Sequence, residues 1–181
     1  PRLIRGMVLS NTYSQSSRYD GEKRPAKFWF ASASVKPLSP RQYAAALAIA
    51  ARNPSHWEDE NEAESRIRNE VNAHRGWANK FAVPNEEFQV SVDEALLFSN
   101  DNAFKDKIRV ANDRLAGELA KLETNEALVQ RAIQAVYSRL ASAEEIEAIS
   151  AYLEARSDRR EDAISQIVWA LMTSSELRFN H

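Results

Sequence analysis

The segment from Glu161 to His181 most constrains the fold of this chain, because it predicts a helix that needs packing partners on most of its surface. Its apolar residues recur at the spacing of one helical stripe, and two more residues widen that stripe. The stripe consists of Ile164, Ile167, Val168, Leu171, Met172 and Ser175, widened by Trp169 and Ala170. The upstream elements that can cover such a helix are themselves predicted helices.

Several upstream residues are typical of helix starts, where a side-chain oxygen accepts a hydrogen bond from a free backbone N–H group. Ser91 and Ser142 are followed three residues later by Glu94 and Glu145, so both sites predict a capping box. Pro40 suits the first position of a helix, because its missing N–H is not needed there. The residues predicted to cap helices are Ser39, Ser55, Ser91, Thr124 (or Asn125), Ser142 and Asp158.

Apolar residues recur from Phe104 to Leu122 with a helical period, which predicts one helix of several turns. Residues 95–98 of the helix after Ser91 are predicted to be buried. Only four of the 181 residues are glycine, and 44% are hydrophobic, which favours a packed helical domain over turn-rich β structure.

We therefore expect an all-α fold of six to eight helices, in which a C-terminal antiparallel helical bundle follows a long N-terminal loop. Short links between the later helices favour antiparallel neighbours. The chain is expected to form a single domain over residues 1–181, with an irregular helical half at 1–103 and a bundle half at 104–181. Because it begins with Pro1, we expect it to be a piece of a longer protein.

The composition argues against several classes of function. The chain has no cysteine, so disulfides, thiolate metal sites and covalent haem attachment are excluded within it. The 24 basic and 26 acidic residues are intermixed, which does not favour a nucleic-acid partner. No apolar run approaches the ~18 residues of a membrane span, so no membrane insertion is expected. Phosphate-binding glycine loops and nucleophile elbows are absent.

The candidate site residues are few. Glu70 and His74 stand four apart on one predicted helix and can supply two metal ligands, but no third ligand is visible, so we interpret them as a solvated pair. Glu176 with Arg178, Arg139 with Glu144 or Glu145, and Ser91 with Glu94 are possible acid–base pairs, and all lie at predicted helix ends. We predict no catalytic residue, metal site or cofactor in this chain.

Aromatic residues gather in and after the loop at residues 10–30. They can stack on sugar rings or nucleobases, although core packing or loop anchoring explains most such residues. The candidate surface or terminus-anchoring residues are Tyr13, Tyr19, Trp29, Arg139, Glu176, Asn180 and His181. We expect the last two to tie the terminus back to the loop at residues 10–18.

Several short segments, spread over most of the chain, resemble in their order one family of bacterial domains. They are residues 3–5, 10–13 and 16–17, the run 35–42, residues 88–91 with 94–96 and Asn100, Tyr137-Ser138-Arg139 with Glu144-Glu145, and residues 169–172 with Ser175-Glu176 and Phe179-Asn180-His181. The family is the C-terminal domain of unknown function of exported planctomycete proteins. Ala141 and Leu177 depart from its pattern, which more often has proline and an aromatic residue there.

The resemblance implies an exported location, upstream domains of the same polypeptide as partners, and a haem in a neighbouring cytochrome c-like domain. It supplies no catalytic residues. Our leading hypothesis is a non-catalytic scaffold or interaction module. The alternative is a carbohydrate-binding or hydrolytic domain that uses the loop at residues 10–30 as one wall of a cleft.

Overall fold

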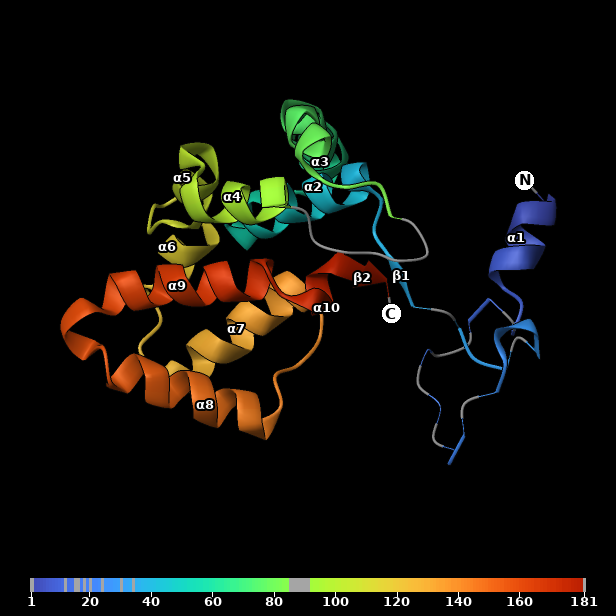
Figure 1. The fold of residues 1–181 in the computed structure, drawn as a ribbon. Coiled ribbons are helices and arrows are strands. Elements are labelled where there is room, and N and C mark those ends of the chain that lie inside the picture. Colours follow the sequence, from blue (N-terminus) through green and yellow to red (C-terminus); the bar gives the residue numbers. More distant parts are fainter. Residues whose placement is uncertain are drawn as a thin grey trace. The chain divides into compact units, whose positions relative to one another are not determined.

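The computed structural model describes residues 2–11, 13–14, 17, 19, 21–23, 25–29, 31–33, 35–84 and 92–180. The structure is 68% helical, and eight of its α-helices have seven residues or more (Figure 1), which confirms the all-α prediction. Contacts along the chain define two units. Residues 1–37 and 179–181 form the smaller unit, and Leu38–Arg178 forms the larger one.

The smaller unit contains α1 (Arg2–Val8), a short 3₁₀ helix (Lys27–Trp29) and a pair of two-residue strands. The strands β1 (Lys36–Pro37) and β2 (Phe179–Asn180) are antiparallel, with Lys36 opposite Asn180. The backbone near the C-terminus therefore pairs with residues 36–37. His181 and the side chain of Asn180 lie outside the described residues, so the predicted contact of this terminus with residues 10–18 stays a prediction.

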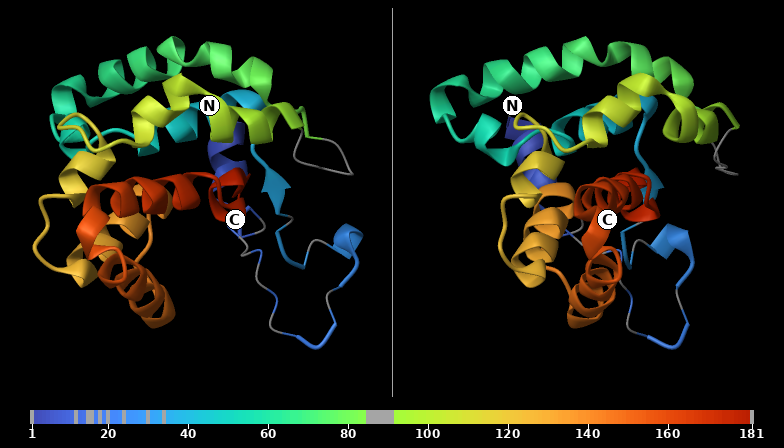
Figure 2. Two further views of the ribbon diagram at one scale, coloured as in Figure 1. Left: turned by 60° about the vertical axis from the view of Figure 1, so that its left-hand side comes forward. Right: turned by 90° about the vertical axis from the view of Figure 1, so that its left-hand side faces the viewer.

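The larger unit consists of helices joined by short links. Its α-helices are α2 (Pro40–Ala50), α3 (Glu60–Ala73), α4 (Val92–Asn100), α5 (Asn102–Ile108), α6 (Leu115–Leu119), α7 (Asn125–Tyr137), α8 (Ala143–Glu154), α9 (Arg160–Met172) and α10 (Ser175–Arg178), and its 3₁₀ helices are Pro54–Trp57, Arg75–Lys80 and Ser157–Arg159. Helix α2 packs against α3 and the Arg75–Lys80 segment, whereas α7, α8 and α9 pack against one another. Helices α8 and α9 lie side by side and run in opposite directions (Figures 1 and 2).

Three of the predicted caps are confirmed. The Ser39 side chain accepts from the backbone N–H of Gln42, and the Gln42 side chain accepts from the backbone of Ser39, which forms a capping box ahead of Pro40. Ser142 and Glu145 form the same reciprocal arrangement at the start of α8. Thr124 accepts from the N–H of Ala127 and caps α7. These caps depend only on residues within one turn, which a sequence specifies directly.

Two predicted caps are wrong. Ser55 does not begin α3, because Asn53 caps the intervening 3₁₀ helix and Asp59 caps α3 itself. Asp158 lies within the 3₁₀ helix Ser157–Arg159 rather than at the N-cap of α9, which has no side-chain cap. The predicted capping box at Ser91 lies outside the described residues, although Glu94 is described and is buried.

The predicted single helix from Phe104 to Leu122 is also wrong. Helix α5 ends at Ile108, and α6 begins only at Leu115. Between them the chain pairs with the end of α2, since the N–H of Leu115 donates to the Ala51 carbonyl at 3.0 Å. Gly117 allows this path, because a Cβ atom there would stand 1.8 Å from the carbonyl oxygen of Ala111.

One hydrophobic core extends from Tyr43 in α2 to Met172 in α9, and so it includes residues on both sides of position 103. An aromatic cluster links its parts, with Phe98 and Phe104 rings 5.0 Å apart and Trp77 and Phe104 rings 6.0 Å apart. Rings in this range attract one another beyond the effect of their buried area.

The apolar stripe of α9 is buried at Ile164, Ile167, Val168, Leu171 and Met172. The expected widening of this stripe is wrong, because Ala170 is exposed and Trp169 is 39% exposed. The Trp169 indole N–H donates to the Phe98 carbonyl at 3.0 Å, which holds the ring at the edge of the core. The predicted burial of Ala95 and Leu96 in α4 is likewise wrong, since both residues are exposed.

The C-terminal end of α9 receives hydrogen bonds from two tyrosines of other helices. The Tyr43 hydroxyl in α2 donates to the Met172 carbonyl at 3.3 Å, and the Tyr137 hydroxyl in α7 donates to the Leu171 carbonyl at 3.1 Å. The last carbonyl groups of a helix have no partner within the helix itself. The two tyrosines therefore add hydrogen bonds at the end of α9, where the Ser174 N–H also donates to the Leu171 carbonyl at 3.3 Å.

Candidate functional site

Arg139 holds two carboxylates that come from different helices. Its Nη2 atom lies 2.7 Å from Oε1 of Glu145 and 2.8 Å from Oε2 of Glu176, and its Nη1 atom lies 2.9 Å from Oε2 of Glu145. Ser138 makes this possible by taking a left-handed backbone conformation, with φ of 58°, directly after α7. We refer to Arg139, Glu145 and Glu176 as the Arg139 cluster.

The Arg139 cluster is suited to structure rather than proton transfer. Hydrogen bonds from Arg139 lower the pKa of Glu145 to about 2, so this carboxyl is ionised at neutral pH and is a poor proton donor. The hydrogen bonds that Arg139 donates to Glu145 and Glu176 also raise the pKa of the Arg139 guanidinium, and the bonds to Glu145 contribute most. The cluster therefore joins the end of α7, the start of α8 and helix α10 by ion pairs.

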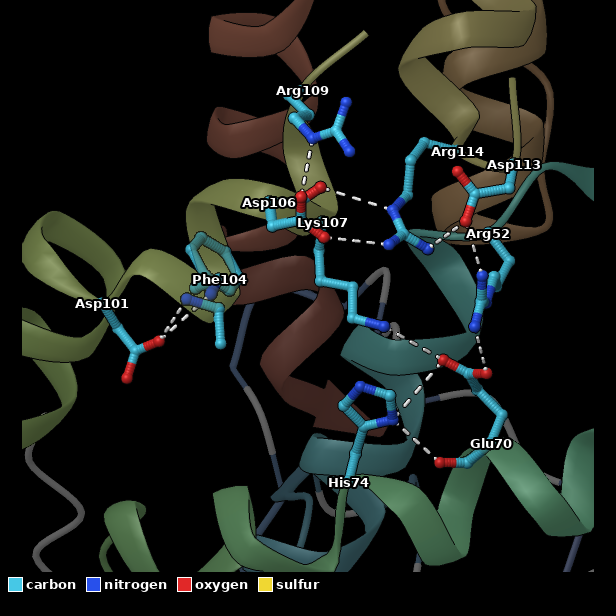
Figure 3. A network of polar contacts seen from close by, with 11 residues as sticks. Arg52, Glu70, His74, Asp101, Phe104, Asp106, Lys107, Arg109, Asp113 and Arg114 are labelled. Carbon is cyan, nitrogen blue, oxygen red and sulfur yellow. Dashed lines mark hydrogen bonds and ion pairs between the residues drawn. The ribbon is translucent and has the colours of Figure 1, made fainter. Parts of the chain in front are cut away.

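A second polar network surrounds Glu70, which is only 6% exposed (Figure 3). Arg52 Nη2 lies 2.8 Å from Glu70 Oε2, and Lys107 Nζ lies 3.3 Å from Oε1. His74 Nδ1 lies 3.4 Å from Oε1 and 2.9 Å from the Glu70 carbonyl oxygen. The interpretation of Glu70 and His74 as a solvated pair is wrong, because the chain folds α2 and α5 over Glu70.

Arg52 extends this network toward the loop before α6. Its Nη1 atom lies 2.8 Å from Oδ2 of Asp113, and the same oxygen lies 2.7 Å from Nη1 of Arg114. Arg114 in turn lies 3.0 Å from Asp106 at the end of α5. The network therefore ties α2, α3, α5 and this loop together (Figure 3).

The charges in the Glu70 network compensate one another. Burial opposes the ionisation of Glu70, but hydrogen bonding by Arg52 and the charge of Lys107 outweigh it, so its pKa is lowered. Burial lowers the pKa of Lys107, and Glu70 partly offsets that effect. Within the described residues, no group of three or more histidine, aspartate or glutamate side chains is placed to hold a metal ion.

The predicted pairing of Glu176 with Arg178 is replaced by two longer-range pairs. Glu176 pairs with Arg139, and Arg178 lies 3.5 Å from Glu94, which is 2% exposed. The Arg178 guanidinium also lies 4.1 Å from the ring centre of Tyr43, a cation–π arrangement. Burial raises the pKa of Glu94, and the charge of Arg178 partly offsets this.

The predicted aromatic candidates lie at the surface. Tyr13, Tyr19 and Trp29 are all exposed, and Trp29 and Phe28 are each 71% exposed with ring centres 5.5 Å apart. The interpretation that core packing explains these three rings is therefore wrong, and loop anchoring stays a prediction. Two grooves among the described residues are lined by other side chains.

The more apolar of these grooves, with a volume of about 540 Å³, lies between α8 and α9. It is lined by Ala148, Ile149, Tyr152, Gln166, Ile167, Trp169, Ala170 and Leu171. The Tyr152 hydroxyl bonds to Gln166 across it, and the Arg156 guanidinium lies 4.0 Å from the centre of the Tyr152 ring. Sequence reasoning missed this groove because it assigned Trp169 and Ala170 to the buried stripe.

No helix among the described residues is both long and apolar enough to cross a membrane. Comparison of the chain with protein-family models, with curated proteins and with solved structures gave no match.

Proposed function

We propose that this chain is a non-catalytic interaction module of a larger exported protein that also carries a cytochrome c-like, haem-binding domain. The observation that carries the proposal is the open groove between α8 and α9, where Trp169 and Ala170 are exposed beside the buried stripe of α9. Exposed apolar surfaces with an aromatic side chain are typical of protein interaction sites. The export and the haem neighbour are taken from the resemblance to the planctomycete domain family.

The charged clusters support a scaffold role over a catalytic one. The Arg139 cluster and the Glu70 network connect helices, and their carboxylates accept hydrogen bonds from basic side chains. A general acid or base needs a carboxyl group with a pKa near the working pH, whereas those of Glu70 and Glu145 are lowered. These groups therefore stabilise the fold that presents the groove.

The test is a titration of the purified chain with the cytochrome c-like domain of the same polypeptide, followed by isothermal calorimetry. Saturable binding of one domain per chain is expected. The absence of binding to any neighbouring domain of that polypeptide would contradict the proposal. Elemental analysis provides an independent test, because one tightly held metal ion per chain would argue for a catalytic or electron-transfer role.

Carbohydrate binding is the second candidate, and the exposed rings of Phe28 and Trp29 favour it. Exposed aromatic rings can stack on the apolar face of a sugar. A glycan array probed with the chain and with Trp29→Ala tests this candidate. Binding that the substitution removes would support it, and an array without any bound glycan would reject it. Trp169→Ala is the matched control, since Trp169 is also an exposed aromatic residue and lies outside the loop at residues 10–30.

A further inference from the structure

The residues that line the groove between α8 and α9 span about 6 Å along α8, from Ala148 to Tyr152, and about 8 Å along α9, from Gln166 to Leu171. The Tyr152–Gln166 hydrogen bond crosses it at one end. Glu145 stands one turn before Ile149 on the same side of α8, so the Arg139 cluster lies toward the other end. From Glu145 to Tyr152 the axis of α8 rises by about 10 Å at 1.5 Å per residue.

The walls of the groove suit the apolar face of a helix. Ala148 and Ala170 are small, so a partner backbone can approach closely between α8 and α9. Ile149 and the exposed ring of Trp169 offer larger apolar surfaces beside them. Helices bind in such grooves through apolar residues that recur at positions i, i+3, i+4 and i+7.

The charge around the groove favours a partner whose side chains carry the opposite charge. Residues 143–172 contain seven carboxylates and three arginines, a formal charge of −4, whereas the whole chain has a formal charge of −2. The excess negative charge is therefore concentrated on the two helices that form the groove. A partner with basic side chains is attracted to this region, and one with acidic side chains is repelled.

Two exposed carboxylates flank the groove directly. Glu144 stands one turn before Ala148 in α8, and Asp162 stands one turn before Gln166 in α9. Neither forms an ion pair within the part of the chain that the structure describes. Tyr152 in α8 bonds to Gln166 in α9, and Glu144 and Asp162 stand eight and four residues before these two positions. Because α8 and α9 run in opposite directions, the two carboxylates lie beyond opposite ends of the groove, about 18 Å apart along it.

We propose that this groove binds an amphipathic helix of a partner protein, whose apolar face covers Ala148, Ala170 and Trp169. Two lysine or arginine residues of that helix, about eleven positions or three turns apart, pair with Glu144 and Asp162 beyond the ends of the groove. This inference rests on the proposed interaction function and specifies the chemistry of the partner.

The test uses two fluorescein-labelled synthetic helices of about 16 residues that share one leucine face. One carries lysine and the other glutamate at two flanking positions about eleven residues apart, and fluorescence anisotropy measures their binding to the full chain. The lysine peptide is expected to bind about tenfold or more tightly than the glutamate peptide. This preference should fall to about twofold in the double variant Glu144→Gln with Asp162→Asn.

A matched double variant, Glu147→Gln with Glu161→Gln, removes the same charge from positions that are not one turn from a groove-lining residue. It should keep the preference for lysine. Ala170→Arg places a bulky cation in the groove at an exposed position and should abolish binding of the lysine peptide. Circular dichroism of each variant checks that the helical fold is retained.

Equal binding of the two peptides, or unchanged binding to the Ala170→Arg variant, would overturn the inference. Self-association that Ala170→Arg removes, measured by analytical ultracentrifugation, would also overturn it, because a second copy would then occupy the groove. Binding of the cytochrome c-like domain with the same affinity by the chain and by Ala170→Arg would reject the groove inference and leave the proposed function intact.

Discussion

Arg139 and Glu176 stand 37 positions apart in the chain, and they form a two-point ion pair with contacts of 2.5 and 2.8 Å. Glu145 binds the same guanidinium, so one arginine fixes where α7, α8 and α10 meet. Removing this side chain would therefore remove the ion pairs that join three helix ends.

Arg139→Ala is expected to lower the free energy of unfolding by about 1–2 kcal/mol, because two carboxylates lose bidentate hydrogen bonds at a partly solvated site. Urea unfolding followed by circular dichroism measures the change. Arg68→Ala is the matched control, since its pair with Glu64 within α3 is largely exposed. Its effect should stay below about 0.5 kcal/mol. Equal effects of the two substitutions would show that the Arg139 cluster adds no special stability.

The stability that Glu145 provides should depend on pH. Its pKa is about 2 in the folded chain, against an ordinary value of 4.5. A carboxyl whose pKa is lower in the folded state stabilises the fold above its unfolded pKa and loses that effect as the pH falls. The stability difference between the chain and Glu145→Gln, about 1–2 kcal/mol at neutral pH, should shrink between pH 4.5 and about pH 2. A difference that does not change with pH would contradict the assigned ion pair.

Glu70→Gln should be more harmful, because it leaves Arg52 and Lys107 partly buried beside a neutral group. We expect a loss of about 3 kcal/mol. Lys107→Met, which removes one cation and leaves Glu70 paired with Arg52, should cost about 1 kcal/mol or less. Chemical unfolding of the two variants compares them directly, and a larger loss for Lys107→Met would reverse the proposed order of importance.

Gly117→Ala should destabilise the chain by at least about 2 kcal/mol, since the new Cβ atom would collide with backbone atoms that cannot rotate away. Gly76→Ala provides the control, because no atom lies within 4 Å of a Cβ at that position. This change should be neutral or stabilise by up to about 1 kcal/mol. Thermal unfolding of both variants tests the pair, and a tolerated Gly117→Ala would mean that the chain between α5 and α6 follows another path.

The sequence was informative wherever a feature depends on neighbouring residues. Ser39, Thr124 and Ser142 cap helices as predicted, because the donor and acceptor lie within one turn of each other. The wrong prediction at Ser55 also concerns a local cap. Asp59 stands four residues later, and its side chain accepts the hydrogen bond at the start of α3.

Features that depend on distant segments were not predictable from the pattern. The apolar period from Phe104 to Leu122 continues through a bend, because hydrogen bonds to the end of α2 hold the intervening backbone. Partner choice among charged residues has the same limit. The sequence offers Glu144 or Glu145 as a partner of Arg139 and pairs Glu176 with Arg178, whereas in the structure the α8–α9 hairpin brings Glu176 to Arg139.

The exposure of Trp169 shows why the groove was missed. A helical period identifies which residues share a face, but it does not show where the cover provided by neighbouring helices ends. Ile167 and Leu171 are covered, whereas Trp169 and Ala170 are not.

The tyrosine hydroxyls of α2 and α7 connect the end of α9 to two other helices through its backbone. Tyr43 and Tyr137 donate to the Met172 and Leu171 carbonyls, and each carbonyl oxygen can accept a second hydrogen bond as well. Replacing either tyrosine with phenylalanine therefore leaves the core filled but removes one polar connection between the end of α9 and a neighbouring helix.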